Sequence, residues 1–148
     1  MVEDDAGVAG YVVGTTDTRA FDAQLERDWW PALRRHYADT ADIAPEARNA
    51  DQNRIFAIHH PGVTPDEIVG PFPAHMHMNL LPRLQGQGLG TGLFKAWFER
   101  ARELGAMGVH VGVSPTNPRG MAFWQAMGFV RRPVAGSNAI WLGQPIDR

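Results

Sequence analysis

Residues 85–92 read QGQGLGTG and place four glycines in eight positions, between the apolar run MNLLP (78–82) and a segment with helical periodicity. Glycine in an ordered segment costs about 0.5–1 kcal/mol relative to alanine, so such a cluster needs a physical reason. One reason is a tight turn from a strand into a helix. The other is a phosphate site, because a glycine loop at a helix N-terminus exposes consecutive backbone N–H groups at the positive end of the helix dipole. The position of the cluster favours the phosphate site over the turn alone.

Composition limits the class of protein. With 148 residues, 44% hydrophobic and 20% charged, the chain suits one globular domain. A net charge of −2 gives no basic field, so we expect no nucleic-acid partner. The chain has no cysteine, which excludes disulfides, thiolate metal sites and cysteine nucleophiles. No apolar run approaches about 18–20 residues, and the acidic start MVEDD is unlike a signal peptide, so we expect a soluble cytoplasmic protein with no membrane partner.

Hydrophobic periodicity predicts an α/β domain with a mixed sheet. The predicted strands are residues 8–15, 75–81, 108–113 and two closing strands within 129–134 and 139–143. The predicted helices are a first one from Asp17 or Thr18 to Tyr37, then 44–60, 92–106 and 117–129. Pro31 is expected to kink or split the first helix. Four prolines and two glycines between 60 and 75 predict a loop with one short helical turn.

Two of these helices have a clear apolar side. The helix 44–60 is expected to bury Ile55, Phe56 and Ile58, with Pro45 near its first turn. The helix 92–106 places Leu93, Phe94, Trp97, Ala101 and Leu104 on one stripe, with Gly105 as its C-cap.

The glycine spacing discriminates between phosphate ligands. A dinucleotide fold requires G-x-G-x-x-G after the first strand, whereas this cluster lies in the middle of the chain. A P-loop requires Gly-Lys-Ser/Thr, which is missing. The pattern that fits is Q-x-x-G-x-G, formed by Gln85, Gly88 and Gly90. A phosphate- or nucleotide-binding domain of another fold stays open as a third hypothesis.

A second block supports the first. Residues 117–129, NPRGMAFWQAMGF, have Asn at the start of a predicted helix, a small residue three positions on, an aromatic residue seven on and Gly-Phe at eleven and twelve on. Together the two blocks resemble the GNAT superfamily of N-acyltransferases, over about residues 75–143. The segments DWWPALRRHY (28–37), HHPG (59–62) and HMHMNLLPRLQGQGLG (75–90) are similar to bacterial stand-alone relatives of the acetyltransferase-like C-terminal domain of O-GlcNAcase.

This resemblance implies a GNAT-like α/β fold, with a mixed, mostly antiparallel sheet, flanking helices and a splayed parallel pair formed by 75–81 and 108–113. The implied cofactor is acetyl-CoA. Its pantetheine arm would pair with Leu80, the amides of Gln85 through Gly90 would hold its pyrophosphate, and Asn117 would reach the pantetheine or the sulfur. The full set of implied cofactor-binding residues is Leu80, Gln85, Gly86, Gln87, Gly88, Leu89, Gly90, Thr91, Asn117, Arg119 and Trp124.

The resemblance also implies N-acetyl transfer by direct attack of a neutral amine in a ternary complex, without a protein nucleophile. The candidate bases are His75, His77 and Asn79, which share one strand face because side chains alternate along a strand. Trp124 stands where many relatives carry tyrosine, and its indole N–H is no useful acid. A catalytically silent acyl-CoA-binding or protein-interaction module is therefore the alternative.

Other histidines invite a metal hypothesis, which we reject. His59 and His60 could join His75 and His77, but no acidic ligand stands at helical spacing as in H-E-x-x-H, so no metal is predicted.

The domain prediction is one GNAT-like domain over 1–148, with a helical insertion at about 17–73 and a cofactor-binding core at about 74–143. The strand and helices that open the family fold are missing before the strand 8–15, so we expect a truncated form, a mis-started reading frame or an open acceptor face. The acceptor site should then be less complete than the cofactor site. An apolar surface is expected there, which favours a homodimer. The acceptor itself is an unidentified amine, of a small molecule or of a protein lysine.

Overall fold

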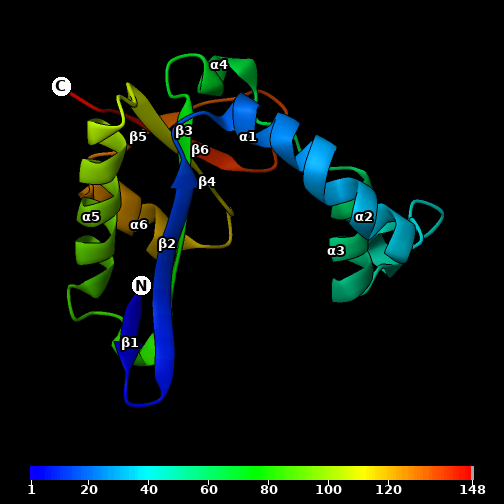
Figure 1. Ribbon diagram of the computed structural model, residues 1–148, viewed down its shortest axis with the longest axis horizontal. Coiled ribbons are helices and arrows are strands. Elements are labelled where there is room, and N and C mark those ends of the chain that lie inside the picture. The colour runs from blue at the N-terminus through cyan, green and yellow to red at the C-terminus, as the bar shows by residue number, and fades with distance from the viewer. Residues whose placement is uncertain (148) are drawn as a thin grey trace. The chain divides into compact units, whose positions relative to one another are not determined.

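A six-stranded sheet organises the first of two units in the computed structural model, which describes residues 1–147 (Figure 1). This unit comprises Met1–Thr18 and the described chain from Pro65 onward. The sheet has the order β1-β2-β3-β4-β6-β5, in which only β3 and β4 are parallel. The strands are β1 (Val2–Asp4), β2 (Gly7–Thr15), β3 (Ala74–Leu80), β4 (Gly108–Val113), β5 (Val130–Arg132) and β6 (Ile140–Pro145). The predicted mixed, mostly antiparallel sheet is confirmed.

The parallel pair separates along its length. β3 and β4 are in register only at Ala74 with Val109 and at His75 with His110. The rest of β3, up to Leu80, pairs with β2 on its other side and has no partner in β4. The splayed pair expected from the resemblance is therefore present, and it leaves unpaired backbone along one edge of β3.

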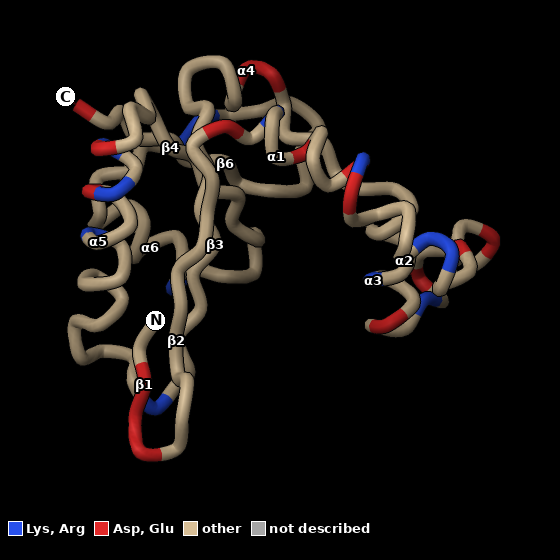
Figure 2. The backbone as a smooth tube through the Cα atoms, viewed as in Figure 1, with Lys and Arg blue, Asp and Glu red and all other residues tan. Residues whose placement is uncertain are grey.

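The chain begins with a hairpin that the sequence analysis missed. β1 pairs antiparallel with β2, and Gly7, the first residue of β2, has a φ of 102°, a left-handed value that favours glycine. Arg83 is ion-paired with Asp4, with Nε 2.7 Å from Oδ2, and Figure 2 shows positive and negative residues meeting at this hairpin. A strand of three residues carries too little periodicity to be recognised from sequence.

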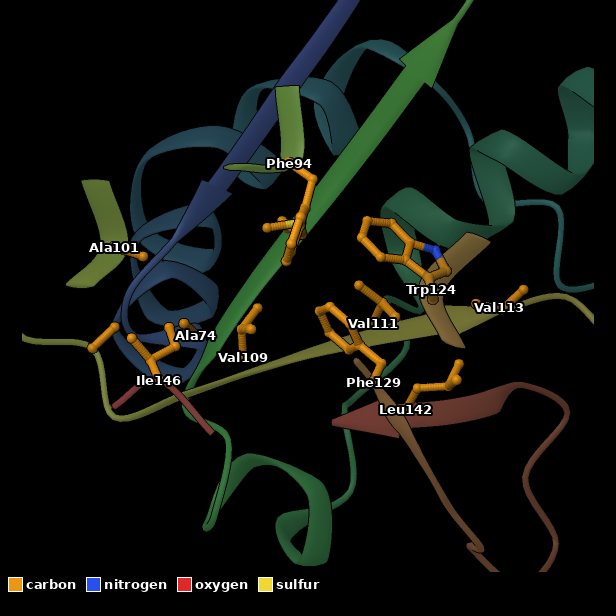
Figure 3. Close-up of a cluster of buried hydrophobic side chains, with 12 residues drawn as sticks. Ala74, Phe94, Ala101, Val109, Val111, Val113, Trp124, Phe129, Leu142 and Ile146 are labelled. Atoms are coloured by element: carbon orange, nitrogen blue, oxygen red, sulfur yellow. The ribbon is translucent and has the colours of Figure 1, made fainter. Parts of the chain in front are cut away.

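Two helices pack on one face of the sheet, α5 (Leu89–Glu103) and α6 (Pro118–Ala126) (Figure 1). Their buried side chains meet those of the central strands in a core that includes Phe94, Trp124, Phe129 and Leu142 (Figure 3). Burial of these apolar side chains is the main source of stability in this unit. The predicted short turn between 60 and 75 is α4 (Asp66–Val69), and a 3₁₀ turn, Pro82–Leu84, follows β3.

The apolar stripe predicted for α5 is correct except at its end. Leu93, Phe94 and Ala101 are buried, whereas Leu104 is 57% exposed. The reason is that the helix ends at Glu103 and Gly105 turns the chain away with a φ of 81°. The helix also begins at Leu89, three residues before the predicted start.

The second unit, Arg19–Thr64, is helical. Its first predicted helix is divided into α1 (Thr18–Gln24), a π-helical stretch (Leu25–Trp29) and α2 (Trp30–His36). The N–H of Trp30 donates to the carbonyl of Leu25, five residues back, one residue before Pro31. Because Pro31 has no N–H to continue a regular ladder, the predicted split is physically explained.

The remaining helix of this unit is shorter than predicted. α3 (Ala50–His59) starts at Ala50 because Asn49 and Gln52 form a reciprocal capping box, and Pro45–Ala47 forms a separate 3₁₀ turn. The residues expected to be buried, Ile55, Phe56 and Ile58, are only half-buried. The boundary of the predicted insertion at about 17–73 stays a prediction. Across residues 1–147, no helix is both long enough and apolar enough to cross a bilayer.

Candidate functional site

A cavity of about 580 Å³ lies in the first unit, between the end of β3 and the starts of α5 and α6. Most of the predicted cofactor-binding residues line it: Leu80, Gln85, Gly86, Gly88, Gly90, Thr91, Asn117, Arg119 and Trp124. Gln87 and Leu89 are not among the lining residues. Met78, Gly120 and Phe123 line it too and were missed. Gly120 and Phe123 lie within the second block, and Met78 precedes Leu80 by one strand repeat, so the sequence held a signal for each.

The glycines of the loop have two different roles. Gly86 and Gly88 both have a φ of 79°, and a Cβ at either would touch nothing within 4 Å. Glycine is needed there for backbone conformation. Gly90 has no such φ, but its Cβ would lie 3.4 Å from the ring of Phe123 and 3.8 Å from the methyl of Met78. These are ordinary contact distances, so the backbone would accept an alanine at residue 90, unlike at residues 86 and 88.

Backbone donors of the loop point to an anion site. The N–H of Gln85 donates to the carbonyl of Pro82 at 3.1 Å, and the N–H of Gly92 donates to Gly88 at 3.1 Å. Between them, the N–H groups of residues 86–91 have no acceptor in the part of the chain that the structure describes. Six consecutive donors thus gather at the N-terminus of a 15-residue helix.

The prediction that the amide of Gln85 belongs to this cradle is wrong, because that amide is occupied by Pro82. Gln85 acts through its side chain instead. Its Nε2 donates to the carbonyl of Leu80 at 2.9 Å and ties the loop to the end of β3.

Leu80 presents its backbone toward the gap between β3 and β4. The next residue, Leu81, donates its N–H to Ala9 of β2 at 2.8 Å. Because backbone groups alternate in direction along a strand, the N–H and carbonyl of Leu80 face the other way, toward β4. β4 has no residue in register with Leu80, so the N–H of Leu80 is available to another extended chain, while its carbonyl already accepts from Nε2 of Gln85.

The start of α6 explains the spacing of the second block. Asn117 caps the helix, with Oδ1 accepting from the N–H of Gly120 at 2.9 Å. A Cβ at Gly120 would lie 2.6 Å from Nδ2 of Asn117, so a larger residue there would push the Asn117 side chain out of its capping position. Arg119, in the same turn, lines the cavity and has no salt bridge within residues 1–147. It is the one charged side chain of that lining.

Trp124 is mainly a core residue. It is 8% exposed, and its ring centroid lies 5.0 Å from that of Phe123 and 5.1 Å from that of Phe129 (Figure 3). One part of the side chain forms cavity wall. A packed indole supplies shape and apolar contact rather than a proton.

Two of the three candidate bases lie together. Nδ2 of Asn79 is 3.1 Å from Nε2 of His77 and donates to the hydroxyl of Tyr11 at 2.9 Å. An amide NH₂ can only donate, so Nε2 of His77 is the acceptor of that bond. Asn79 lines the cavity and connects it to this cluster. Tyr11 was missed, because its position opposite Asn79 depends on the register between β2 and β3.

His75 lies elsewhere, where β3 and β4 are still paired. Its Nδ1 is 2.9 Å from Oγ1 of Thr18, which itself donates to the carbonyl of Pro73 at 2.7 Å. The hydroxyl proton is committed to Pro73, so Nδ1 of His75 carries the proton of the other bond. Its ring is 5.7 Å from that of buried His110, and His75 is not a lining residue of the cavity.

The second pair of histidines is engaged in the helical unit. Nε2 of His59 is 2.8 Å from the carbonyl of Tyr37, and Nε2 of His60 is 2.8 Å from Oδ2 of Asp39. Within the described residues, no group of three or more His, Cys, Asp or Glu side chains could hold a metal ion.

Comparisons with known proteins agree with this geometry. The sequence model described as the acetyltransferase (GNAT) family matches residues 2–129. A solved structure of a protein called SsHAT is 32% identical, with a TM-score of 0.84, and covers 99% of this chain and 71% of its own. A solved structure described as an acetyltransferase is 17% identical with a TM-score of 0.58, and shares the fold over 99% of this chain and 68% of its own.

Protein O-GlcNAcase of Rattus norvegicus and that of Mus musculus are each 20% identical over 128 residues. The match covers 86% of this chain but only 14% of those much longer proteins.

Proposed function

Since the chain belongs to the acetyltransferase (GNAT) family, whose fold supports acyl-CoA-dependent acetyl transfer, we propose that it transfers the acetyl group of acetyl-CoA to a primary amine. The observation that carries the proposal is the row of N–H groups at residues 86–91 that have no acceptor in the described part of the chain. Four of these residues, Gly86, Gly88, Gly90 and Thr91, line a cavity of about 580 Å³. The proposal includes the cytoplasmic location and the homodimer expected from the sequence.

The lining of this cavity fits a polyanionic ligand. Its only charged side chain is Arg119, and no carboxylate lines it. The amides of residues 86–91 would hold the diphosphate, with the dipole of α5 adding to their field. Arg119 would add a mobile positive charge, and the N–H of Leu80, whose carbonyl already accepts from Gln85, would donate to a carbonyl of the pantetheine arm. When bound, acetyl-CoA supplies a thioester carbonyl that is activated for attack.

Proton handling belongs to the cluster beside the cavity. His77 is exposed, and its basic nitrogen is Nε2. It can take the surplus proton of an attacking amine through a water once that water replaces the N–H of Asn79 at Nε2. Asn79 holds the imidazole in that tautomer and is itself held by Tyr11. His75 is hydrogen-bonded to Thr18 and lies away from the cavity, so we assign it no role in this step.

The test is binding of acetyl-CoA by calorimetric titration of a matched pair of variants. Gly88→Ala and Gly136→Ala both place a side chain at a left-handed position, with φ of 79° and 70°, and in both the new Cβ meets nothing within 4 Å. The backbone strain is therefore similar, about 1–2 kcal/mol. We expect Gly88→Ala to lower the affinity for acetyl-CoA at least about tenfold, because it disturbs the row of N–H donors. Gly136→Ala should leave that affinity unchanged. Equal affinities in the two variants would contradict the assigned loop.

A silent acyl-CoA-binding module is the second candidate, and the burial of Trp124 favours it. The cavity wall has no tyrosine at that place to protonate a departing thiolate. Release of coenzyme A in the presence of a panel of amines decides between the two. Turnover supports transfer, and tight binding of acetyl-CoA without turnover supports the silent module.

A further inference from the structure

The sheet face that points away from α5 and α6 has a distinctive charge pattern. Strands β2, β3, β4 and β6 contain no Asp, Glu, Lys or Arg at all. Figure 2 shows β3, and β2 beyond its hairpin, without charged residues. On this face, at the open end of the parallel pair, Tyr11 lies across from Asn79 and Val13 across from His77. These four side chains form a patch that we call the neutral patch.

The neutral patch borders the cavity. Asn79 belongs to both, and its Nδ2 bonds the hydroxyl of Tyr11 and Nε2 of His77. Because β3 and β4 are unpaired here, an acceptor that reaches Asn79 from this side meets the cavity at its edge. No carboxylate lines the cavity or stands on β2 or β3, and the one charged residue of the lining, Arg119, is positive, so these elements offer an ammonium group no compensating charge.

Eight of the sixteen Asp and Glu residues of the chain form ion pairs within their own unit. In the first unit, Asp4, Glu99 and Glu103 pair with arginines on the hairpin side and on α5. In the second unit the pairs are Asp22 with Arg19, Glu26 with Arg34, Asp28 with Arg27, Asp39 with His60 and Asp51 with Arg54. Each pair already neutralises the charge that an ammonium would need.

On the premise of the proposed function, we propose that the acceptor is a weakly basic amine, namely an α-amino group, rather than a lysine side chain or a polyamine. An α-amino group has a pKa of about 7.7–8.0 and lysine about 10.4, so near pH 7 the neutral fraction of the α-amine is about 200–400-fold larger. The neutral patch binds the neutral form, with the hydroxyl oxygen of Tyr11 accepting an amine hydrogen on its second lone pair. The ring of Tyr11 offers a weak cation–π contact, which is no substitute for a carboxylate.

The chemical step balances without a further reactant. The lone pair of the amine nitrogen forms the new N–C bond, and the C–S bond breaks with its electron pair going to sulfur. The surplus proton of the nitrogen passes through His77 to water, and the thiolate takes a proton from water.

The first experiment compares kcat/KM near pH 7 for three acceptors: a lysine-free peptide with a free N-terminus, the same peptide acetylated at its N-terminus and carrying one lysine, and spermidine. We expect the free α-amine to be preferred at least about 100-fold, which follows from its larger neutral fraction. A preference for lysine or spermidine, or no preference, overturns this inference while leaving acetyl transfer intact. Acetylation of none of them, with acetyl-CoA bound, defeats the proposed function and this inference together.

A second readout needs no turnover. Calorimetry of the same peptide with the protein loaded with coenzyme A, in two buffers of different ionisation enthalpy, counts the protons released on binding. Near pH 7 most of the α-amine is protonated in solution, so binding of the neutral form releases close to one proton for each peptide. Release of no proton shows that the ammonium binds, and contradicts the inference.

A designed carboxylate gives the third test. Val13 is 54% exposed and lies across from His77, so Val13→Glu places a negative charge in the neutral patch, and Val13→Gln is its uncharged match. We expect Val13→Glu to raise kcat/KM for spermidine relative to the α-amine by at least about tenfold, which is the effect of one close charge. Val13→Gln should leave that ratio as it is. An identical ratio in both variants contradicts the inference.

Discussion

The two units of this chain are stabilised in opposite ways. All the buried apolar side chains of the described residues belong to the sheet unit, and the helical unit of residues 19–64 contributes only Thr40 as a buried residue. The helical unit is held by ion pairs such as Glu26 with Arg34, by the capping box of Asn49 and Gln52, and by hydrogen bonds of its histidines. The cavity lies entirely within the sheet unit.

The difference between the two units shows which of them can hold a binding site in a fixed geometry. A packed core fixes the backbone around the donor row to within the tolerance of side-chain packing. Solvent-exposed polar contacts hold the helices with less energy and allow local opening. Matched substitutions in the two units measure how large the contrast is.

Loss of a buried ring gives the largest expected effect. Phe129 is 3% exposed and packs on Trp124 and Phe94, so Phe129→Ala should lower the free energy of unfolding by about 3–5 kcal/mol. Phe56 of α3 is half-buried, with its ring on His60 and under Arg48, so Phe56→Ala should cost about 1 kcal/mol. Urea unfolding measures both. Equal costs would show that the helical unit has a core of its own.

Two histidines that bond a backbone carbonyl give the next effect. Nδ1 of buried His110 is 2.7 Å from the carbonyl of Phe72, whereas His59 makes its bond to Tyr37 within reach of water. His110→Phe leaves a buried carbonyl without that donor and should cost about 1–3 kcal/mol. His59→Phe should cost less than about 1 kcal/mol, because water replaces the ring. Thermal unfolding of the two variants is the check, and a larger loss for His59→Phe would reverse the comparison.

Helix caps test stability and function at once. Asn117 caps α6 at the cavity and Asn49 caps α3. Replacement of either by alanine should cost about 1 kcal/mol of stability. Only Asn117→Ala should also lower the affinity for acetyl-CoA, by at least about threefold in a calorimetric titration. If Asn49→Ala weakens acetyl-CoA equally, the two units do not divide their tasks as described.

Acid gives the smallest effect. The hydrogen bond from Arg34 holds the pKa of Glu26 below its usual value, and Arg27 does the same for the pKa of Asp28. A carboxyl group whose pKa is lower in the folded state stabilises the fold at pH values above its usual pKa. This contribution is lost as the pH falls through the usual pKa toward the lowered pKa. Amide exchange of α2 should therefore accelerate relative to β4 between about pH 6 and about pH 3, after correction for the intrinsic rate. Glu26→Gln should remove part of this pH dependence, and an unchanged profile in that variant would contradict the role of the pair.

Much of the sheet unit could be predicted from the sequence, because its signals are local. β4 was predicted with both ends correct, and the loop and second block lie on the cavity as expected. Errors came where a hydrogen bond outside the pattern decided a helix boundary or occupied a donor. Asn49 and Gln52 set the start of α3, and the carbonyl of Pro82 occupies the amide of Gln85.

The side-chain contacts between residues far apart in sequence could not be predicted, because they depend on how the strands pair. Tyr11 joins Asn79 across 68 residues of chain, and Asp4 joins Arg83 across 79. Neither pair has a spacing that a helix or a single strand would reveal. His75 and His77 share a face as predicted, yet the divergence of β3 from β4 puts them in different surroundings.

The short register between β3 and β4 has a mechanical consequence. Within the described residues, strands β1-β2-β3 are joined to strands β4-β6-β5 by only two register pairs, Ala74 with Val109 and His75 with His110. Rotation about this junction changes the width of the gap at Leu80 without breaking the strand-to-strand hydrogen bonds within either group of three strands. A ligand bound in the gap therefore applies force at this junction. There His75 is hydrogen-bonded to Thr18, the residue directly before the helical unit.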